Sequence, residues 1–131
     1  MPTGTDLAAT QIKLVSAALL LILSFILGYW LNKMGKPYHI ALLTSHKLIS
    51  LALFVLLCIV VYRFSQIHEF NAVVTSLCVI TGLLFLGSLV SGGLLSTDLA
   101  LPSFLKITHH ITPYLAVLFS GITLYLIISP K

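Results

Sequence analysis

Residues 45–63 read SHKLISLALFVLLCIVVYR, and this stretch decides the fold because no charged residue separates Lys47 from Arg63. The hydrocarbon core of a membrane is about 30 Å thick, so a helix needs about 20 apolar residues to cross it. With the apolar residues that flank it, the stretch reaches this length. We therefore expect a transmembrane helix over residues 40–64.

Three further stretches are equally apolar, and we expect transmembrane helices over residues 12–31, 71–95 and 104–128, with residues 1–10 as a short polar tail. Only 8% of the 131 residues are charged, whereas a soluble domain carries about 25% because its surface must face water. This composition excludes a soluble globular enzyme. Short connections between the helices predict one all-α transmembrane domain over residues 1–131, an up-down four-helix bundle.

The charge pattern limits the classes of partner that the chain is expected to bind. Seven Lys and Arg residues stand against three Asp and Glu, a formal net charge of +4. The basic residues occur singly, which is typical of anchors at membrane surfaces rather than of nucleic-acid binding. We expect a multi-pass integral membrane protein in contact with lipid and without a nucleic-acid partner. Cys58 and Cys78 form no CxxC motif, which excludes c-type haem attachment.

Five histidines are the informative residues, because ionisable groups at membrane depth are costly and usually functional. We expect His68 to lie in a solvated loop and His39 to lie at the membrane interface. His46 and the adjacent pair His109 and His110 fall inside the expected helices. No acidic residue lies within a span, which argues against a proton- or cation-coupled transporter.

His46 and His109 lie at similar depths. His46 follows Pro37 by nine residues and His109 follows Pro102 by seven, so both lie roughly 10–13 Å past a helix-starting proline on helices that begin at the same membrane face. Two imidazoles at one depth suit the two axial positions of a single haem b, whereas zinc or copper needs further ligands. The alternatives are a structural membrane subunit whose histidines only lock helices together, and another metal or proton relay.

His109 is favoured over its neighbour His110 as the second ligand. Successive helical residues point about 100° apart, so only one of the two can face the iron. The face of His109 continues through small residues such as Ala116, which suit a flat ring, and His110 stays the alternative. For the other ring nitrogen of each ligand we expect partners among the carbonyls near Leu42 and the hydroxyl of Thr112.

Lysines and small residues are expected to support the cofactor and the packing of the helices. Haem propionates near the membrane face would pair with Lys106, Lys36, Lys47 or His39. Pairs of small residues four apart allow close helix packing, or alternatively leave clearance for a flat cofactor. These pairs are Ser24 with Gly28, Gly87 with Ser91, and Ser88 with Gly92.

Two stretches resemble a known family. Residues 45–63 resemble the second helix of bacterial cytochrome b561 and of hydrogenase or formate dehydrogenase cytochrome b subunits, where a His-Lys pair opens a leucine-rich helix that ends in arginine. Residues 91–116, SGGLLSTDLALPSFLKITHHITPYLA, are similar to the third loop and fourth helix, with a Leu-Pro in the loop and a histidine followed five residues later by an aromatic, here His109 and Tyr114. The resemblance implies that His109 is the ligand opposite His46.

One departure from the family is instructive. Family members with two haems use a histidine in the first helix and a further histidine about four turns along the fourth helix. In this chain the first helix has no histidine, and Thr123 and Leu124 lie where the further histidine of the fourth helix would be. The resemblance thus implies a single-haem electron-transfer protein rather than a self-contained enzyme. It would carry electrons between a quinone pool and a redox partner or larger respiratory complex in a prokaryotic cytoplasmic membrane. His39, His110 or Tyr114 would hydrogen-bond the quinone.

Overall fold

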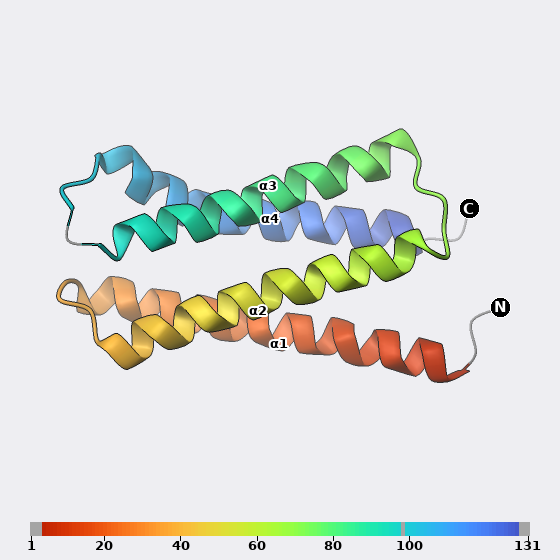
Figure 1. Cartoon of the computed structure of the whole chain (residues 1–131), viewed down its shortest axis with the longest axis horizontal. Coiled ribbons are helices and arrows are strands. Elements are labelled where there is room, and N and C mark those ends of the chain that lie inside the picture. Colours follow the sequence, from red (N-terminus) through yellow and green to blue (C-terminus); the bar gives the residue numbers. More distant parts are fainter. Residues whose placement is uncertain (1–3, 98, 129–131) are drawn as a thin grey trace. The chain divides into compact units, whose positions relative to one another are not determined.

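The computed structural model describes residues 4–97 and 99–128, leaving aside the side chains of residues 4–7 and 128. In this part of the chain there are four α-helices and no strand (Figure 1). The predicted all-α fold with four helices is confirmed. The helices are α1 (Gly4–Met34), α2 (Ile40–Ser65), α3 (Ala72–Leu95) and α4 (Ser103–Ile128).

The bounds of α2, α3 and α4 agree with the expected ones to within one residue. The start of α1 was predicted wrongly, because the helix begins at Gly4 and residues 4–10 are helical rather than a polar tail. Residues 1–3 of the expected tail lie outside the described residues. The end of α1 at Met34 also lies beyond the expected end at residue 31. Between Gly4 and Gly28 the chain has no glycine or proline to interrupt a helix. Once a helix is nucleated, each added residue gains a backbone hydrogen bond, so polarity alone does not end it.

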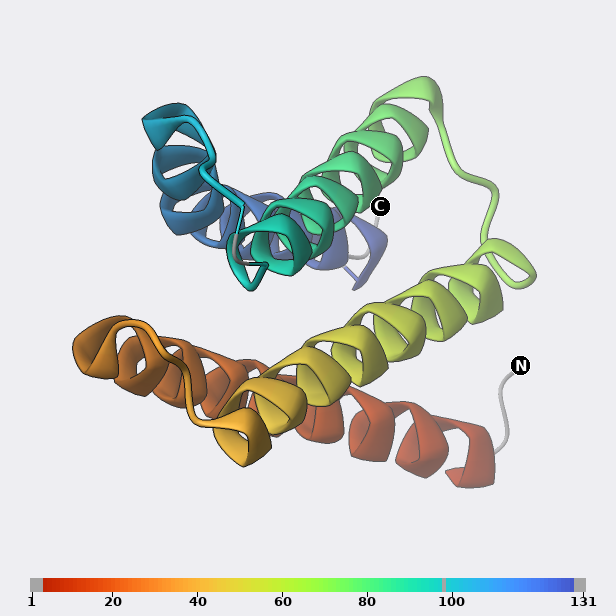
Figure 2. The same ribbon diagram turned by 60° about the vertical axis from the view of Figure 1, so that its left-hand side comes forward.

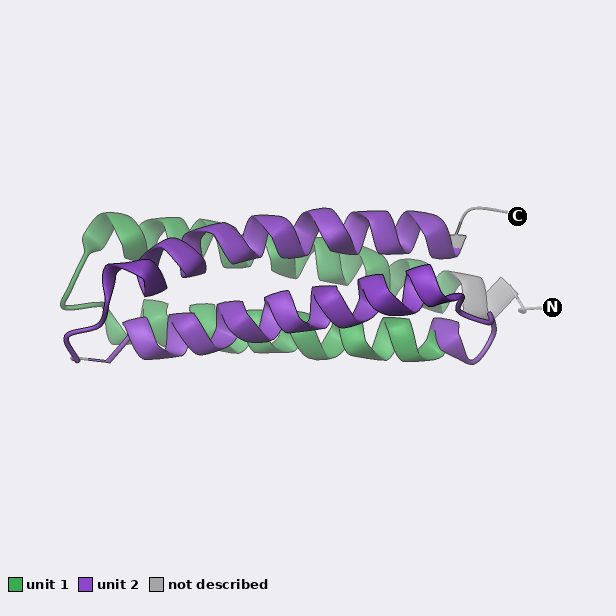
Figure 3. Cartoon of the chain, turned by 90° about the horizontal axis from the view of Figure 1, so that it is seen from above, with its two compact units in different colours: residues 1–63 green, residues 64–131 purple. Residues whose placement is uncertain are grey.

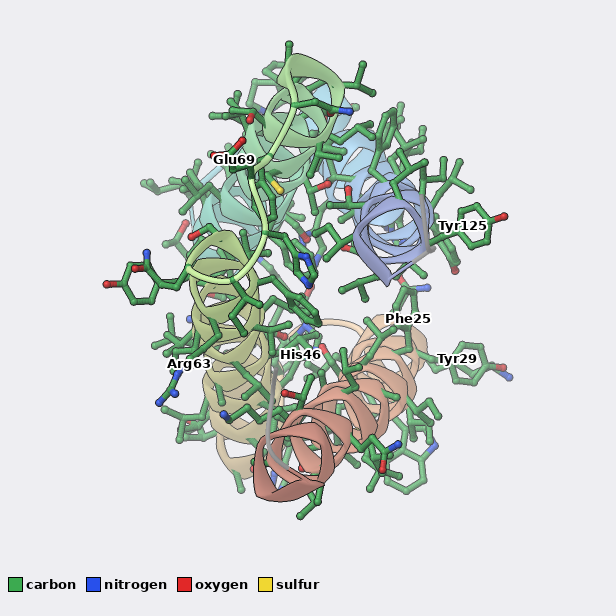
Figure 4. All side chains as sticks on the ribbon, turned by 90° about the vertical axis from the view of Figure 1, so that its right-hand side faces the viewer. Phe25, Tyr29, His46, Arg63, Glu69 and Tyr125 are labelled. Carbon is green, nitrogen blue, oxygen red and sulfur yellow. The ribbon has the colours of Figure 1, made fainter. Side chains whose placement is uncertain are left out.

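All four helices are long and apolar enough to cross a membrane, with apolar stretches of 24 to 27 residues. Their large apolar side chains are widely exposed, for example Ile40 at 80% and Ile12 at 66%. Tyr29 and Tyr125 project outward from their helices (Figure 4). Lipid accepts such a surface and water does not. The chain is therefore a multi-pass membrane protein that contacts lipid.

The chain divides into two compact units, Met1–Arg63 and Phe64–Lys131 (Figure 3). We call the pair α1 and α2 the first hairpin and the pair α3 and α4 the second hairpin. Within each hairpin the two helices run in opposite directions, side by side (Figures 1 and 2). Each hairpin is described by itself below.

Local signals set the ends of the helices. After α1, Gly35 has a φ of 65°, a conformation that glycine adopts without strain, and its N–H donates to the carbonyl of Leu31 at 3.1 Å. At the start of α3, the side chain of Asn71 accepts a hydrogen bond from the backbone N–H of Val74 at 2.9 Å. This is an N-cap, which satisfies a backbone donor that has no partner inside the helix.

Helix α4 contains Pro113 in its interior. Proline has no N–H, so the carbonyl of His109, four residues earlier, lacks its usual helical donor, and the proline ring crowds that carbonyl. Figure 2 shows α4 bent after its first turns. The first turns of α4, which carry His109, therefore leave the direction of the rest of the helix.

Candidate functional site

In the first hairpin, His46 is the seventh residue of α2 and lies on the side that faces α1 (Figure 4). Its Nδ1 lies 3.0 Å from the backbone carbonyl oxygen of Ser24 in α1. A carbonyl oxygen can only accept, so Nδ1 must carry the proton and donate it. In the neutral ring, the lone pair that can bind a metal is consequently on Nε2.

Gly28 provides the space for this ring. It lies one turn beyond Ser24, and a Cβ at this position would come within 3.1 Å of Cε1 of His46. Such a contact is tighter than ordinary van der Waals packing, so glycine lets the imidazole approach the backbone of α1. The hydroxyls of Ser24 and Ser50, 2.7 Å apart, add a second hydrogen bond between α1 and α2.

The second hairpin repeats this arrangement. His109 is the seventh residue of α4, and its Nδ1 lies 3.0 Å from the backbone carbonyl oxygen of Ser88 in α3. Gly92 follows Ser88 by one turn, and a Cβ there would lie only 2.5 Å from Cε1 of His109. Real Cβ contacts essentially never come so close, so the ring in this position requires glycine.

We call each of these arrangements a histidine seat. The first seat consists of Ser24, Gly28 and His46, and the second consists of Ser88, Gly92 and His109. In both seats a serine carbonyl fixes the imidazole through Nδ1, and a glycine four residues later lies against the ring.

The two seats differ at the position three residues after the serine. The hydroxyl of Ser91 lies 3.2 Å from Nδ1 of His109 and donates a hydrogen bond to the carbonyl of Ser88 at 3.1 Å. Ser91 is only 3% exposed. The corresponding position of the first seat, three residues after the serine, is Leu27, whose side chain has no hydrogen-bonding atom. The Nδ1–H of His109 therefore has two acceptors on α3.

The structure distinguishes the two adjacent histidines of α4. His109 is half-buried within the second seat, whereas His110 is exposed. The partners expected for Nδ1 were wrong. His46 binds the carbonyl of Ser24 rather than one near Leu42, and the hydroxyl of Thr112 donates to the carbonyl of Thr108 within α4.

The small-residue pairs of the sequence have unequal roles. Two of the three pairs form the seats, so they admit imidazoles as well as bringing helices together. In the third pair, a Cβ at Gly87 would meet nothing within 4 Å, and Ser91 instead serves the second seat. The carbonyl acceptors could not be found from sequence, because every residue has a backbone carbonyl.

The basic residues near the α1–α2 turn are exposed. The Nζ of Lys33 lies 5.5 Å from the ring centroid of Tyr29, and that of Lys36 lies 6.0 Å from that of Tyr38. Such cation–π pairs are typical of aromatic and basic anchors at a membrane surface. Two other candidates for propionate pairing, Lys106 and His39, are also exposed, as is Lys47. Their pairing with a cofactor stays a prediction.

His68 lies between α2 and α3 and is exposed, as expected for a solvated loop residue. Its ring stacks on that of Phe64, with centroids 6.1 Å apart. It has no part in either seat.

Comparison of the chain with protein-family models, with curated proteins and with solved structures finds no match. The resemblance to cytochrome b561 and its relatives stays a prediction that rests on the residues of the two stretches quoted above.

Proposed function

We propose that this chain is a membrane b-type cytochrome that binds one haem b, with His46 and His109 as its axial ligands. The observation that carries the proposal is the shared way in which the two histidines are held. A metal-binding histidine almost always donates its second ring N–H to a carbonyl, carboxylate or water, which fixes the ring and raises its basicity. Both imidazoles here donate Nδ1–H to a serine carbonyl at 3.0 Å.

The chemistry of the two imidazoles fits a haem b. Two neutral imidazoles with their lone pairs on Nε2 are the ligands of a bis-histidine haem. Gly28 and Gly92 leave room beside both rings, where any larger residue would displace them. When bound, a haem b supplies one-electron chemistry through its ferric and ferrous states. The residues of this chain bind and orient it and keep it in an apolar surrounding.

Depth in the membrane supports the pairing. A chain that crosses the membrane with each of its four helices enters α2 and α4 from the same face. Each histidine is the seventh residue of a 26-residue helix. At 1.5 Å per residue, equal positions in the two helices predict equal depths for the two imidazoles, as the two ligands of one ring require.

We further propose that the protein passes electrons between a quinone pool and a redox partner protein or larger respiratory complex in a prokaryotic cytoplasmic membrane. It would serve as a carrier rather than as an enzyme by itself. This part rests on the resemblance of residues 45–63 and 91–116 to cytochrome b subunits. His110 and Tyr114, both exposed and one turn apart on α4, are candidates to hydrogen-bond a quinone, as is the exposed His39.

A structural role is the second candidate, and one observation favours it. Both histidine–serine hydrogen bonds join the two helices of a hairpin, as expected in a membrane subunit whose histidines lock helices together. The two functions use different atoms, because locking requires only Nδ1 whereas haem ligation requires Nε2.

Replacing histidine with asparagine separates the two functions. The amide nitrogen of asparagine can replace Nδ1 as a donor, but asparagine has no atom in the place of Nε2. We expect His46→Asn and His109→Asn to fold, by circular dichroism, and to lose the reduced-minus-oxidised bands of a six-coordinate b haem. The matched control His110→Asn keeps these bands.

Two results would overturn the proposal. One is wild-type protein that carries no haem when purified from haem-replete cells. The other is full haem occupancy in both asparagine variants.

A further inference from the structure

The second seat contains a closed group of three polar atoms. Nδ1 of His109, the carbonyl oxygen of Ser88 and the hydroxyl of Ser91 are separated by 3.0, 3.1 and 3.2 Å. The hydroxyl proton of Ser91 goes to the carbonyl of Ser88, so its oxygen lone pairs face the Nδ1–H of His109. Ser91 is 3% exposed, which excludes competition from water.

Two acceptors restrict the imidazole more than one does. With a single acceptor, a ring can turn about its Cβ–Cγ bond by some tens of degrees before the hydrogen bond fails, because hydrogen bonds tolerate such angular deviation. With two acceptors on α3, a rotation that brings Nδ1 closer to one acceptor takes it away from the other. The contacts at 3.0 and 3.2 Å together therefore favour the observed plane of the His109 ring.

We infer that Ser91 is a positioning residue, which sets the plane of the His109 imidazole and thereby the strength and orientation of this axial ligand. The inference rests on the proposed function for its consequence at the haem. It also has a consequence without haem, since the Nδ1–H of His109 is held by Ser91 in the protein alone. Leu27 at the corresponding position makes the first seat unlike the second in this respect.

The test uses three substitutions in the full chain. Ser91→Ala removes the hydroxyl, and Ser91→Thr retains one. Ser76→Ala is the matched control, because it makes the same change at an exposed position of α3 outside the seat. The three readouts are the ¹⁵N NMR signal of the His109 side chain in haem-free protein, the affinity for ferric haem, and the low-temperature EPR g-values of the ferric protein.

We expect Ser91→Ala to shift or broaden the Nδ1–H signal of His109 and to weaken ferric haem binding about tenfold, within the range typical for loss of a hydrogen bond to a metal ligand. Its EPR g-values should shift or broaden, since they report the planes of the axial imidazoles. Ser91→Thr and Ser76→Ala should match the wild-type protein in all three readouts.

The inference is overturned if folded Ser91→Ala protein matches Ser76→Ala in its ¹⁵N signal, or in haem affinity and g-values. Equal changes in Ser76→Ala also overturn it, because they point to a general effect of a Ser→Ala change in α3. If the wild-type chain takes up no haem, the proposed function fails, while the ¹⁵N comparison still decides whether Ser91 holds the ring. If Ser91→Ala does not fold, Ser91→Cys takes its place, because a thiol has nearly the size of the hydroxyl but is a much weaker acceptor. A ¹⁵N signal equal to that of the wild-type protein then overturns the inference, and an altered one supports it.

Discussion

Gly92→Ala tests the geometry of the second seat most severely. The added Cβ would lie 2.5 Å from Cε1, 3.1 Å from Nδ1 and 3.2 Å from Nε2 of His109. All three atoms belong to one rigid ring, so the ring cannot avoid the methyl group by a small rotation. It must move away from α3 as a whole.

The size of this movement follows from the distances. Ordinary contact between non-bonded carbon atoms is about 3.5–4.0 Å, so the ring must shift by about 1 Å. Such a shift lengthens the 3.0 Å hydrogen bond from Nδ1 to the carbonyl of Ser88 beyond the usual range. Overpacking of this kind typically costs about 1–3 kcal/mol of stability. The displaced ligand should weaken ferric haem binding by about 10–100-fold.

Two glycines of the same chain serve as graded controls. A Cβ at Gly28 meets His46 at 3.1 Å, so Gly28→Ala requires a movement of only a few tenths of an ångström and should weaken haem binding less. A Cβ at Gly93, next to Gly92, meets nothing within 4 Å. Gly93→Ala should therefore bind haem as the wild-type protein does and gain slightly in stability, because alanine is the better helix former.

The assay is titration of haem-free protein with ferric haem in detergent, combined with thermal unfolding. We expect affinity to fall in the order wild type and Gly93→Ala, then Gly28→Ala, then Gly92→Ala. Equal affinity and stability in Gly92→Ala and Gly93→Ala would refute the reasoning, because His109 could then not lie against α3 as described.

Three further substitutions test other parts of the account. Asn71→Ala removes the N-cap of α3 and should lower the free energy of unfolding by about 1 kcal/mol; thermal unfolding checks this, and a stability equal to wild type contradicts it. Ser50→Ala removes the hydroxyl pair with Ser24 and should cost about 0.6 kcal/mol, the average for such bonds in membranes; additive effects in a double-mutant cycle of the two serines would argue against the contact. Pro113→Ala returns a helical donor to the carbonyl of His109, so it should straighten α4 and weaken haem binding in the same titration; unchanged affinity would show that the bend has no role in placing the ligand.

The helices could be predicted from sequence because lipid imposes a simple requirement on the chain. Every backbone polar group must be satisfied inside the membrane, so an apolar stretch of sufficient length has to be helical. The bounds of α2, α3 and α4 follow from this requirement and from the glycines, prolines and polar residues between the helices. The early start of α1 does not follow from it, because residues 5–10 include the polar Thr5, Asp6 and Thr10 yet contain no glycine or proline that would stop a helix.

The seats could be predicted only in part. His46 and His109 were identified by their depth, and the serine–glycine pairs by their spacing. Nothing in the sequence indicated that these pairs contact the two histidines. Which carbonyl accepts from Nδ1 depends on how one helix is rotated against its neighbour, and spacing along one helix does not fix that rotation. Ser91 was noted only as a small residue, since its role arises from the turn of α3 that faces His109.

The central claim is most directly tested by the iron of the purified wild-type protein. Haem content, measured as the pyridine haemochrome, should be one haem b per chain, and the ferric protein should give the low-spin EPR signal of two axial imidazoles. Protein without haem, or with a high-spin, five-coordinate iron, would contradict the account.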